Sequence, residues 1–343
     1  MSSTASTLGR GWVAAFGKHP GWDDHIDDIG LVTPELIAFK RLLYFEGVGT
    51  NIDAGTWERL PSEHRLPNFG HSFLACGGGR LIVGRLWASK DRKGRSLYPM
   101  VVCLQTENVC LATSVAVALP LLQALEAQCR ATESATAVQS AIAAAQARLA
   151  NGVFESNSEV PGPVSDLRSG AVLAQWAERI QPDAEGLGFQ RLCHRFSRDF
   201  VGFQRSAATS RSGSVPAQHL RVPACETSDE RALLLWVALL RKNLPGTVPL
   251  LLFRPFDCDW LDVLVGTAQA QQFACLLSGR ESIPWVTEIP YTLDPDAREK
   301  GARLIDGWRS ESEDGMQALW QIPSEGKENT LSGWWQRVQD LVR

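Results

Sequence analysis

Three apolar segments with strand character follow one another closely at residues 71–76, 81–87 and 97–104. Gly77-Gly78-Gly79 joins the first two, and glycine suits a tight hairpin because it accepts positive φ without steric cost. A longer polar turn, SKDRKGRS, joins the second segment to the third. This pattern predicts three antiparallel strands arranged as a meander.

A short apolar strand is expected at residues 12–16, and a helix is expected to follow the acidic loop after it. Thr33 supplies the N-cap of this helix, and Pro34 suits its first position because the N–H that proline lacks would be unpaired there. Apolar residues recur at intervals of three and four up to Leu43. Gly47 and Gly49 predict the end of the helix.

Residues 112–150 are rich in alanine and predict two or three helices, with breaks at Pro120 and near Thr132. The segment NGVFESNSEVPGP, which begins at Asn151, has the composition of a linker. We therefore divide the chain into residues 1–152 and residues 165–343, with the second part extending the first or packing against it.

The second part predicts helices and a strand pair separated by a polar loop at 206–219. A capping box formed by Thr227 and Glu230 predicts a strongly apolar helix that begins at Ser228. Together these patterns predict an α/β (α+β) fold, a layered sandwich in which helices flank a mainly antiparallel sheet. The remaining expected elements are helices at 171–180, 187–196 and 268–277, strands at 248–253 and 260–265, and an amphipathic C-terminal stretch with Trp320, Trp334 and Trp335.

Composition narrows the class of protein. The 343 residues are 44% hydrophobic and 21% charged, with a net charge of −4 and a pI near 5.9. An acidic chain lacks the Lys/Arg excess of a general nucleic-acid binder. The eight cysteines include no CxxC pair and are expected to be buried free thiols. The chain begins without an apolar leader and has no run of about 18 apolar residues, so we expect a cytoplasmic protein without membrane insertion.

The segment GKHPGWDDHIDDIG, residues 17–30, concentrates potential metal ligands. Pro20 and Gly21 force a turn between its two histidines, so a His-Asp-His metal triad is sterically possible. Alternatively, its first two aspartates cap the turn and the last two are solvated. Four carboxylates this close repel one another, which favours a basic partner or basic residues from a neighbouring loop. The residues concerned are His19, Asp23, Asp24, His25, Asp27 and Asp28.

A basic loop lies between the second and third predicted strands. Its side chains either bind a phosphate or an acidic partner, or are simply exposed to solvent. The chain has no GxxxxGK[ST] loop, no HExxH helix and no GxSxG elbow, and Gly77-Gly78-Gly79 leads into a strand rather than a helix. The basic residues of the loop are Lys90, Arg92, Lys93 and Arg95.

The order of these features resembles the TagF/ImpM family of accessory proteins of bacterial type VI secretion. The family has a GK-x-P turn followed by GDF, and this chain has Gly17-Lys18-His19-Pro20 followed by DDH. The family motif S-x-D-x-x-G-R, followed by an aromatic-Pro pair, is matched at Ser89, Asp91, Gly94, Arg95, Tyr98 and Pro99. An alanine- and leucine-rich helical region follows, and later a strand pair precedes a helix with Phe273, Leu276 and Leu277.

The resemblance implies a non-enzymatic role, with no catalytic residue and no cofactor. Family members act as post-translational repressors of type VI secretion through a forkhead-associated scaffold protein, and some are fused to a serine/threonine phosphatase. We therefore expect a regulator or adaptor whose partner is such a scaffold or phosphatase. The expected contact residues are Lys18, His19, Trp22, Asp23, Asp24, His25, Asp91, Arg92, Lys93 and Arg95. Trp22, Trp57 and the Trp334-Trp335 pair are the tryptophans expected to be exposed.

Three alternatives remain open at this point. The cluster His19, Asp23, Asp24 and His25 is compatible with a metal-dependent hydrolase, because a bound metal generates hydroxide near neutral pH. The same fold is also compatible with an adaptor of another bacterial system. Finally, the acidic turn and the basic loop are compatible with a purely structural pairing that holds the fold.

Overall fold

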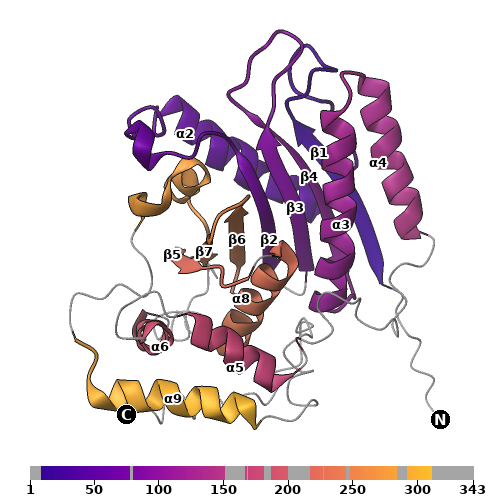
Figure 1. Ribbon diagram of the computed structural model, residues 1–343. Helices are drawn as coiled ribbons and strands as arrows, with labels where there is room; N and C mark the ends of the chain where they lie inside the picture. The colour runs from indigo at the N-terminus through magenta and orange to yellow at the C-terminus, as the bar shows by residue number, and fades with distance from the viewer. Residues whose placement is uncertain are drawn as a thin grey trace, which may run out of the picture.

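The computed structural model describes residues 9–77, 80–150, 167, 169–180, 187–199, 217–226, 228–244, 248–283 and 292–310. These residues form one seven-stranded antiparallel sheet in the order β1-β4-β3-β2-β6-β7-β5 (Figure 1). The strands are β1 (Arg10–Gly17), β2 (Gly70–Gly77), β3 (Arg80–Ala88), β4 (Pro99–Glu107), β5 (Gln218–Pro223), β6 (Leu250–Pro255) and β7 (Trp260–Val265).

The predicted meander is confirmed, because β2 pairs with β3 and β3 pairs with β4 in antiparallel register. β2 also pairs with β6, so the sheet contains strands from both sides of the expected linker. The division at residues 152 and 165 stays a prediction. Strand β5 differs from the sequence expectation, which places its first two residues in the polar loop at 206–219 and predicts no strand for the rest. It carries Arg221 in its interior, and this charge is tolerated because Asp262 of β7 binds it.

A continuous helical segment follows the N-terminal strand. Its predicted start is confirmed, since Thr33 Oγ1 accepts a hydrogen bond from the Leu36 amide at 3.2 Å. The predicted end at Gly47 and Gly49 is wrong. Helix α1 (Pro34–Lys40) continues through the π-helical η1 (Arg41–Gly49) into α2 (Thr50–Asp53). Gly47 serves close packing instead, because a Cβ there would lie 2.6 Å from the Phe273 ring.

The alanine-rich region forms two long helices separated by a short connection at residues 131–134, which confirms the break predicted near Thr132. The break predicted at Pro120 is wrong, because this residue lies on the exposed side of α3, where the unpaired carbonyl one turn earlier can bond to water. The helix predicted to begin at Ser228 is present and begins one residue later, at Asp229, with Ser228 as its N-cap, whose Oγ accepts the Arg231 amide at 3.2 Å. The helices are α3 (Leu111–Arg130), α4 (Ala135–Ala150), α5 (Gly170–Arg179), α6 (Gly188–Asp199), α8 (Asp229–Asn243) and α9 (Pro295–Arg309), with short 3-10 turns η2 (Ser62–His64), η4 (Ala270–Leu277) and η5 (Arg280–Ser282).

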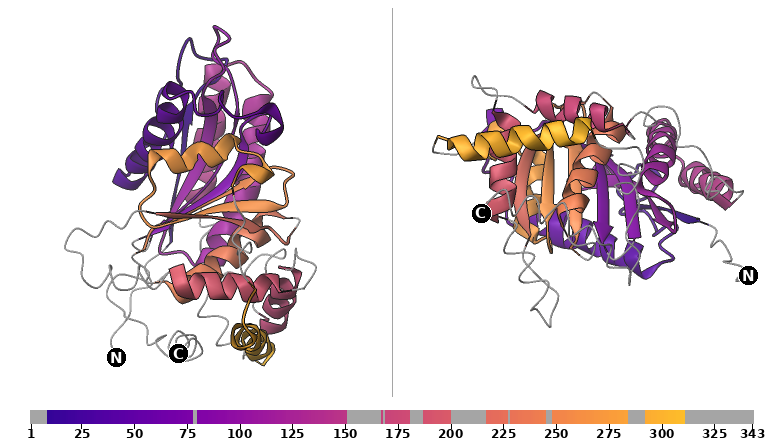
Figure 2. Two further views of the ribbon diagram at one scale, coloured as in Figure 1. Left: turned by 90° about the vertical axis from the view of Figure 1, so that its left-hand side faces the viewer. Right: turned by 90° about the horizontal axis from the view of Figure 1, so that it is seen from below.

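The sheet lies between two layers of helices, which confirms the predicted α+β sandwich (Figure 2). Side chains alternate along each strand, so Leu74 joins the core under α3 and α8 whereas Phe73 joins the core under α1, η1 and η4. Helix α5 reaches the first core through Trp176, whose ring centroid is 5.1 Å from that of Trp236 on α8. Thr227, Trp320, Trp334 and Trp335 lie outside the described residues.

All eight cysteines are free, and each is buried or half-buried. Of the helices that the structure describes, α3 has the length and apolar composition of a membrane span, and 61% of its apolar window is buried. Helix α3 packs against β3 and β4 as the central helix of one layer.

His71 on β2 is a fully buried histidine in the core under η4. Its Nδ1 accepts a hydrogen bond from the Gly70 amide at 3.3 Å, and its Nε2 has no partner among the described residues. Burial lowers the pKa of His71 to about 3, with Asp262 opposing and Arg221 reinforcing the shift. His71 is therefore neutral in the folded protein at neutral pH.

The pH dependence of stability tests this assignment. The unfolded chain protonates His71 below about pH 6.5, whereas the folded chain resists protonation down to about pH 3. Because the unfolded state binds more protons in this interval, stability rises with pH there, by up to about 1.4 kcal/mol per unit from this residue. We expect His71→Phe to remove that part of the slope in urea denaturation. Equal slopes in the two proteins would contradict it.

Candidate functional site

The acidic turn and the basic loop meet at one end of the sheet, beyond β1 and between β3 and β4 (Figure 1). Lys18 lies between them and is 3% exposed. Its Nζ is 2.7 Å from Asp24 Oδ1 on its own turn and 2.7 Å from Asp91 Oδ2 on the basic loop. One buried ammonium group therefore joins the two segments that carry the sequence motifs.

Asp91 is the centre of this arrangement, and its side chain is fully buried. Oδ1 accepts the amides of Lys93 and Arg95 at 2.9 and 3.0 Å, and Oδ2 accepts Lys18 Nζ and Arg95 Nε, each at 2.7 Å. Burial alone would raise the pKa of Asp91, but these hydrogen bonds outweigh it and hold the pKa well below its ordinary range. Asp91 is therefore a permanently ionised anchor.

The spacing S-x-D-x-x-G-R follows from this geometry. The chain turns back on itself between Asp91 and Arg95, whose backbones bond to each other at 3.2 Å. Gly94 takes φ +82° in this turn, a conformation that favours glycine. Arg95 then returns its guanidinium to the carboxylate four residues earlier.

The GK-x-P turn is fitted equally closely against the end of β4. Gly17 has φ +115°, and a Cβ there would lie 2.2 Å from the Pro99 carbonyl oxygen. The next amide, that of Lys18, donates to the same oxygen at 3.2 Å. Glycine at position 17 therefore allows Lys18 to enter the space between the two loops.

Each aspartate of the acidic turn has its own partner, so the expected neutralisation by basic residues of the neighbouring loop is confirmed for the first two. Asp23 pairs with Arg92 at 3.0 Å, and Asp24 pairs with Lys18 and with Arg95 at 3.1 Å. The hydrogen bond from Lys18 is the largest cause of the lowered pKa of Asp24. Asp27 accepts from Trp22 Nε1 at 3.3 Å, and Asp28 pairs with Lys40.

The two histidines of the turn have separate surroundings. His19 is 2% exposed, its Nε2 donates to the Cys129 carbonyl at 3.0 Å, and its Nδ1 accepts the Gly21 amide at 3.0 Å. His25 is exposed, and its ring packs edge-on against Tyr44 and Tyr98. Partial burial and the nearby Lys18 lower the pKa of His25. The structure does not gather the proposed ligands His19, Asp23, Asp24 and His25 around one point.

The remaining predicted contact residues are distributed as follows. Trp22 is half-buried, with its ring edge-on to His19 at 5.6 Å. Lys93 is exposed, and Arg92 also donates to the Gly21 carbonyl at 2.6 Å. Trp57 was expected to be exposed, but it is 3% exposed, and its Nε1 donates to the Ala274 carbonyl on η4.

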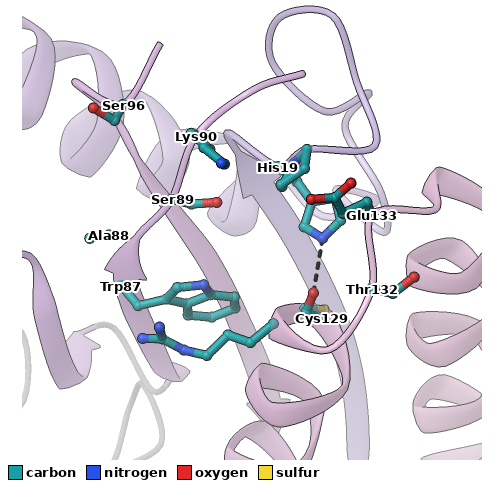
Figure 3. Close-up of a pocket in the computed structure, with 11 residues that line it drawn as sticks. His19, Trp87, Ala88, Ser89, Lys90, Ser96, Cys129, Thr132 and Glu133 are labelled. Carbon is teal, nitrogen blue, oxygen red and sulfur yellow. Dashed lines mark hydrogen bonds between the residues drawn. The ribbon is translucent and has the colours of Figure 1, made fainter. Parts of the chain in front are cut away.

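An open pocket of about 430 Å³ lies beside the buried cluster (Figure 3). The loop after β3 forms one wall with Ser89 and Lys90, and the connection between α3 and α4 forms another with Glu133. Trp87 and Arg130 form the floor, with the guanidinium carbon 5.5 Å from the indole centroid. No sequence pattern indicates this pocket, because its walls come from distant parts of the chain.

A second polar group lies under η4, on the opposite side of the sheet from α3. The ligand atoms of His219, Asp262 and Cys275 lie within 4.8 Å of one another, the one such grouping of metal-ligand types in the described ranges. The carboxylate of Asp262 is already bound by Arg221, however, whose Nε donates to Oδ1 at 3.0 Å and whose Nη2 donates to Oδ2 at 2.7 Å. Burial opposes ionisation of Asp262, but hydrogen bonds from His219 and Arg221 outweigh it and lower its pKa. This carboxylate is already neutralised.

Comparison with known proteins gives little similarity. No family model and no curated protein matches the chain. A solved structure that is similar to part of it is the crystal structure of PA0076 from Pseudomonas aeruginosa PAO1, with 18% identity and a TM-score of 0.28. The match covers 44% of this chain and spans 63% of the length of that one. Similarity this low assigns neither a fold nor a function.

Replacing Lys18 by methionine tests the role of the buried cluster in stability. The substitution leaves the buried carboxylate of Asp91 with one cation fewer, so we expect the free energy of unfolding to fall by about 3 kcal/mol. Lys93→Met, on the exposed part of the same loop, is the matched control and is expected to change it by less than about 0.5 kcal/mol. Equal stability of the two variants in urea denaturation would contradict the assigned role.

Proposed function

We propose that this chain is a non-enzymatic adaptor or regulator that acts by binding another protein, of the kind found among accessory proteins of type VI secretion. One observation carries the proposal: the two segments that resemble the TagF/ImpM motifs converge on Asp91. Lys18 comes from the first motif, and Asp91 and Arg95 come from the second. Their resemblance to the family in sequence is thus matched by direct contact in space.

The chemistry of the cluster favours binding over catalysis. A general acid or base must exchange a proton near the working pH, but Asp91 is ionised and all its nearby donors are engaged. Both ring nitrogens of His19 are likewise hydrogen-bonded within the protein. These groups are suited to holding the loops in place, so no residue is assigned a catalytic role and no cofactor is proposed.

The outer side of the cluster offers a charged surface. The side chains of Asp23 and Arg92 are 64% and 61% exposed, and those of Asp24 and Arg95 are 61% and 51% exposed. Their backbones are fixed by the buried bonds beneath them, and a fixed surface loses less conformational entropy on binding than a mobile one. Mixed charges of this kind favour specificity and association rate.

The partner that we propose is a forkhead-associated scaffold protein of the same secretion system, in the cytoplasm. This choice follows the family resemblance, and the charged surface supports a protein partner of mixed charge. A phosphatase of the same system is the second partner to examine. No role in nucleic-acid binding or membrane insertion is proposed.

The test combines binding and secretion. In a bacterium that carries the secretion genes, we expect overproduction of the chain to reduce the amount of secreted apparatus protein. Arg92→Glu is expected to weaken binding to the purified scaffold about tenfold in calorimetry and to relieve the reduction. Arg303→Glu on α9 is the control, because it reverses an exposed charge far along the chain. Absence of both scaffold binding and any change in secretion would refute the proposed function.

A further inference from the structure

The loop between β3 and β4 has charges that the fold uses and charges that it does not. Arg92 and Arg95 pair with aspartates of the acidic turn, and Arg95 also contacts Asp91. Within the described parts of the chain, the ammonium group of Lys90 has no ion-pair or hydrogen-bond partner. Lys90 lines the pocket of about 430 Å³ beside the cluster.

The opposite wall of this pocket has a free charge of the other sign. Glu133 lies in the short connection between α3 and α4, and its carboxylate also has no partner in the ranges that the structure describes. Figure 3 shows the charged ends of Lys90 and Glu133 turned toward the space between them. The hydrogen bond from His19 to the Cys129 carbonyl ties the turn after β1 to the end of α3, beside the wall that carries Glu133 (Figure 3).

The rest of the pocket offers hydroxyl groups and the side chain of Arg130, which pairs with Glu126. Trp87 belongs to β3 and is 2% exposed, and Arg130 covers its ring. Ser89 and Ser96 stand on the same side as Lys90. A space of this volume accommodates a few side chains of an extended segment but not the diameter of a helix, which is about 10 Å.

The charges distinguish between classes of occupant. A simple anion would be attracted by Lys90 but repelled by Glu133 and by the carbonyl end of α3, which carries partial negative charge. A simple cation would be attracted by Glu133 and the carbonyl end of α3 but repelled by Lys90. An occupant that carries both signs satisfies both walls.

We propose that this pocket receives a short extended segment of the partner protein, with an acidic side chain paired to Lys90 and a basic side chain paired to Glu133. The inference rests on the proposed function and specifies where and by what chemistry the partner is recognised. Asp91 lies next to Lys90 in the chain and holds the loop in place before binding, so little ordering is needed when the segment enters.

The experiment measures the affinity of the purified forkhead-associated scaffold for the wild-type chain and for charge-reversed variants. We expect Lys90→Glu and Glu133→Lys each to raise the Kd at least about tenfold, because each puts a like charge opposite the partner's side chain. The matched controls are Arg303→Glu on α9 and Glu58→Lys, two exposed charges outside the pocket and outside the charged surface. The controls are expected to stay within about twofold of wild type. Thermal unfolding confirms that all variants are folded.

The outcomes separate this inference from the proposed function. If the wild type binds the scaffold and both Lys90→Glu and Glu133→Lys bind it with unchanged affinity, the pocket assignment is overturned and the proposed function stands. If the wild type does not bind the scaffold, the same variants are compared for repression of secretion. Repression by the wild type that both pocket variants lose supports the pocket as the contact for another component. Repression that they retain, or no repression at all, overturns the inference.

Discussion

The buried carboxylate of Asp91 is the interaction on which the rest of this site depends. It accepts two backbone amides from its own loop and two cationic side chains, one of them from a strand end 73 residues earlier in the chain. Removing a charge from water is costly, and this cost is offset only because each of these donors is aligned with an oxygen. Once Asp91 is fixed, Lys18, Arg95 and the backbone between them have little freedom.

The sheet provides the frame for this cluster. Antiparallel pairing of β1 with β4 and of β4 with β3 brings the GK-x-P turn and the basic loop to the same end. Another buried ionic group, centred on Arg85, joins the sheet to α3 and α8. Arg85 on β3 contacts Glu126 of α3 at 2.6 Å and Asp229 of α8 at 3.3 Å. Buried polar groups of this kind are costly if left incomplete, so they favour a single arrangement of strands and helices.

Local signals in the sequence predicted local structure well. The N-cap predicted at Thr33 depends on a side chain that reaches an amide three residues away, and such a short-range bond can be read from spacing. At the start of α8 the same bond comes from Ser228, one residue after the Thr227 that the capping-box pattern indicates. The glycine at position 47 was misinterpreted because its role depends on Phe273, more than two hundred residues later. Strand β5 was missed because Arg221 breaks the apolar pattern, and its partner Asp262 belongs to another strand.

The site could be predicted only in part, because, as with Gly47 and β5, the rest of it depends on residues distant in the chain. The sequence identified both charged segments and the need for opposite charges near the acidic turn. It could not show that Lys18 is buried between them, or that His19 and His25, six residues apart, have unrelated surroundings. Side-chain direction within an irregular turn depends on tertiary contacts, such as the Cys129 carbonyl at the end of α3.

Hydrogen exchange of the Lys93 and Arg95 amides, followed by NMR, tests the central role of Asp91 most directly. Both amides lie in an exposed loop and donate to the Asp91 carboxylate. We predict that both exchange slowly in the wild type and at least about tenfold faster in Asp91→Ala, while the amide of Cys103 in β4 keeps its protection. Exchange of the two loop amides at the rate of an unstructured peptide in the wild type would contradict it.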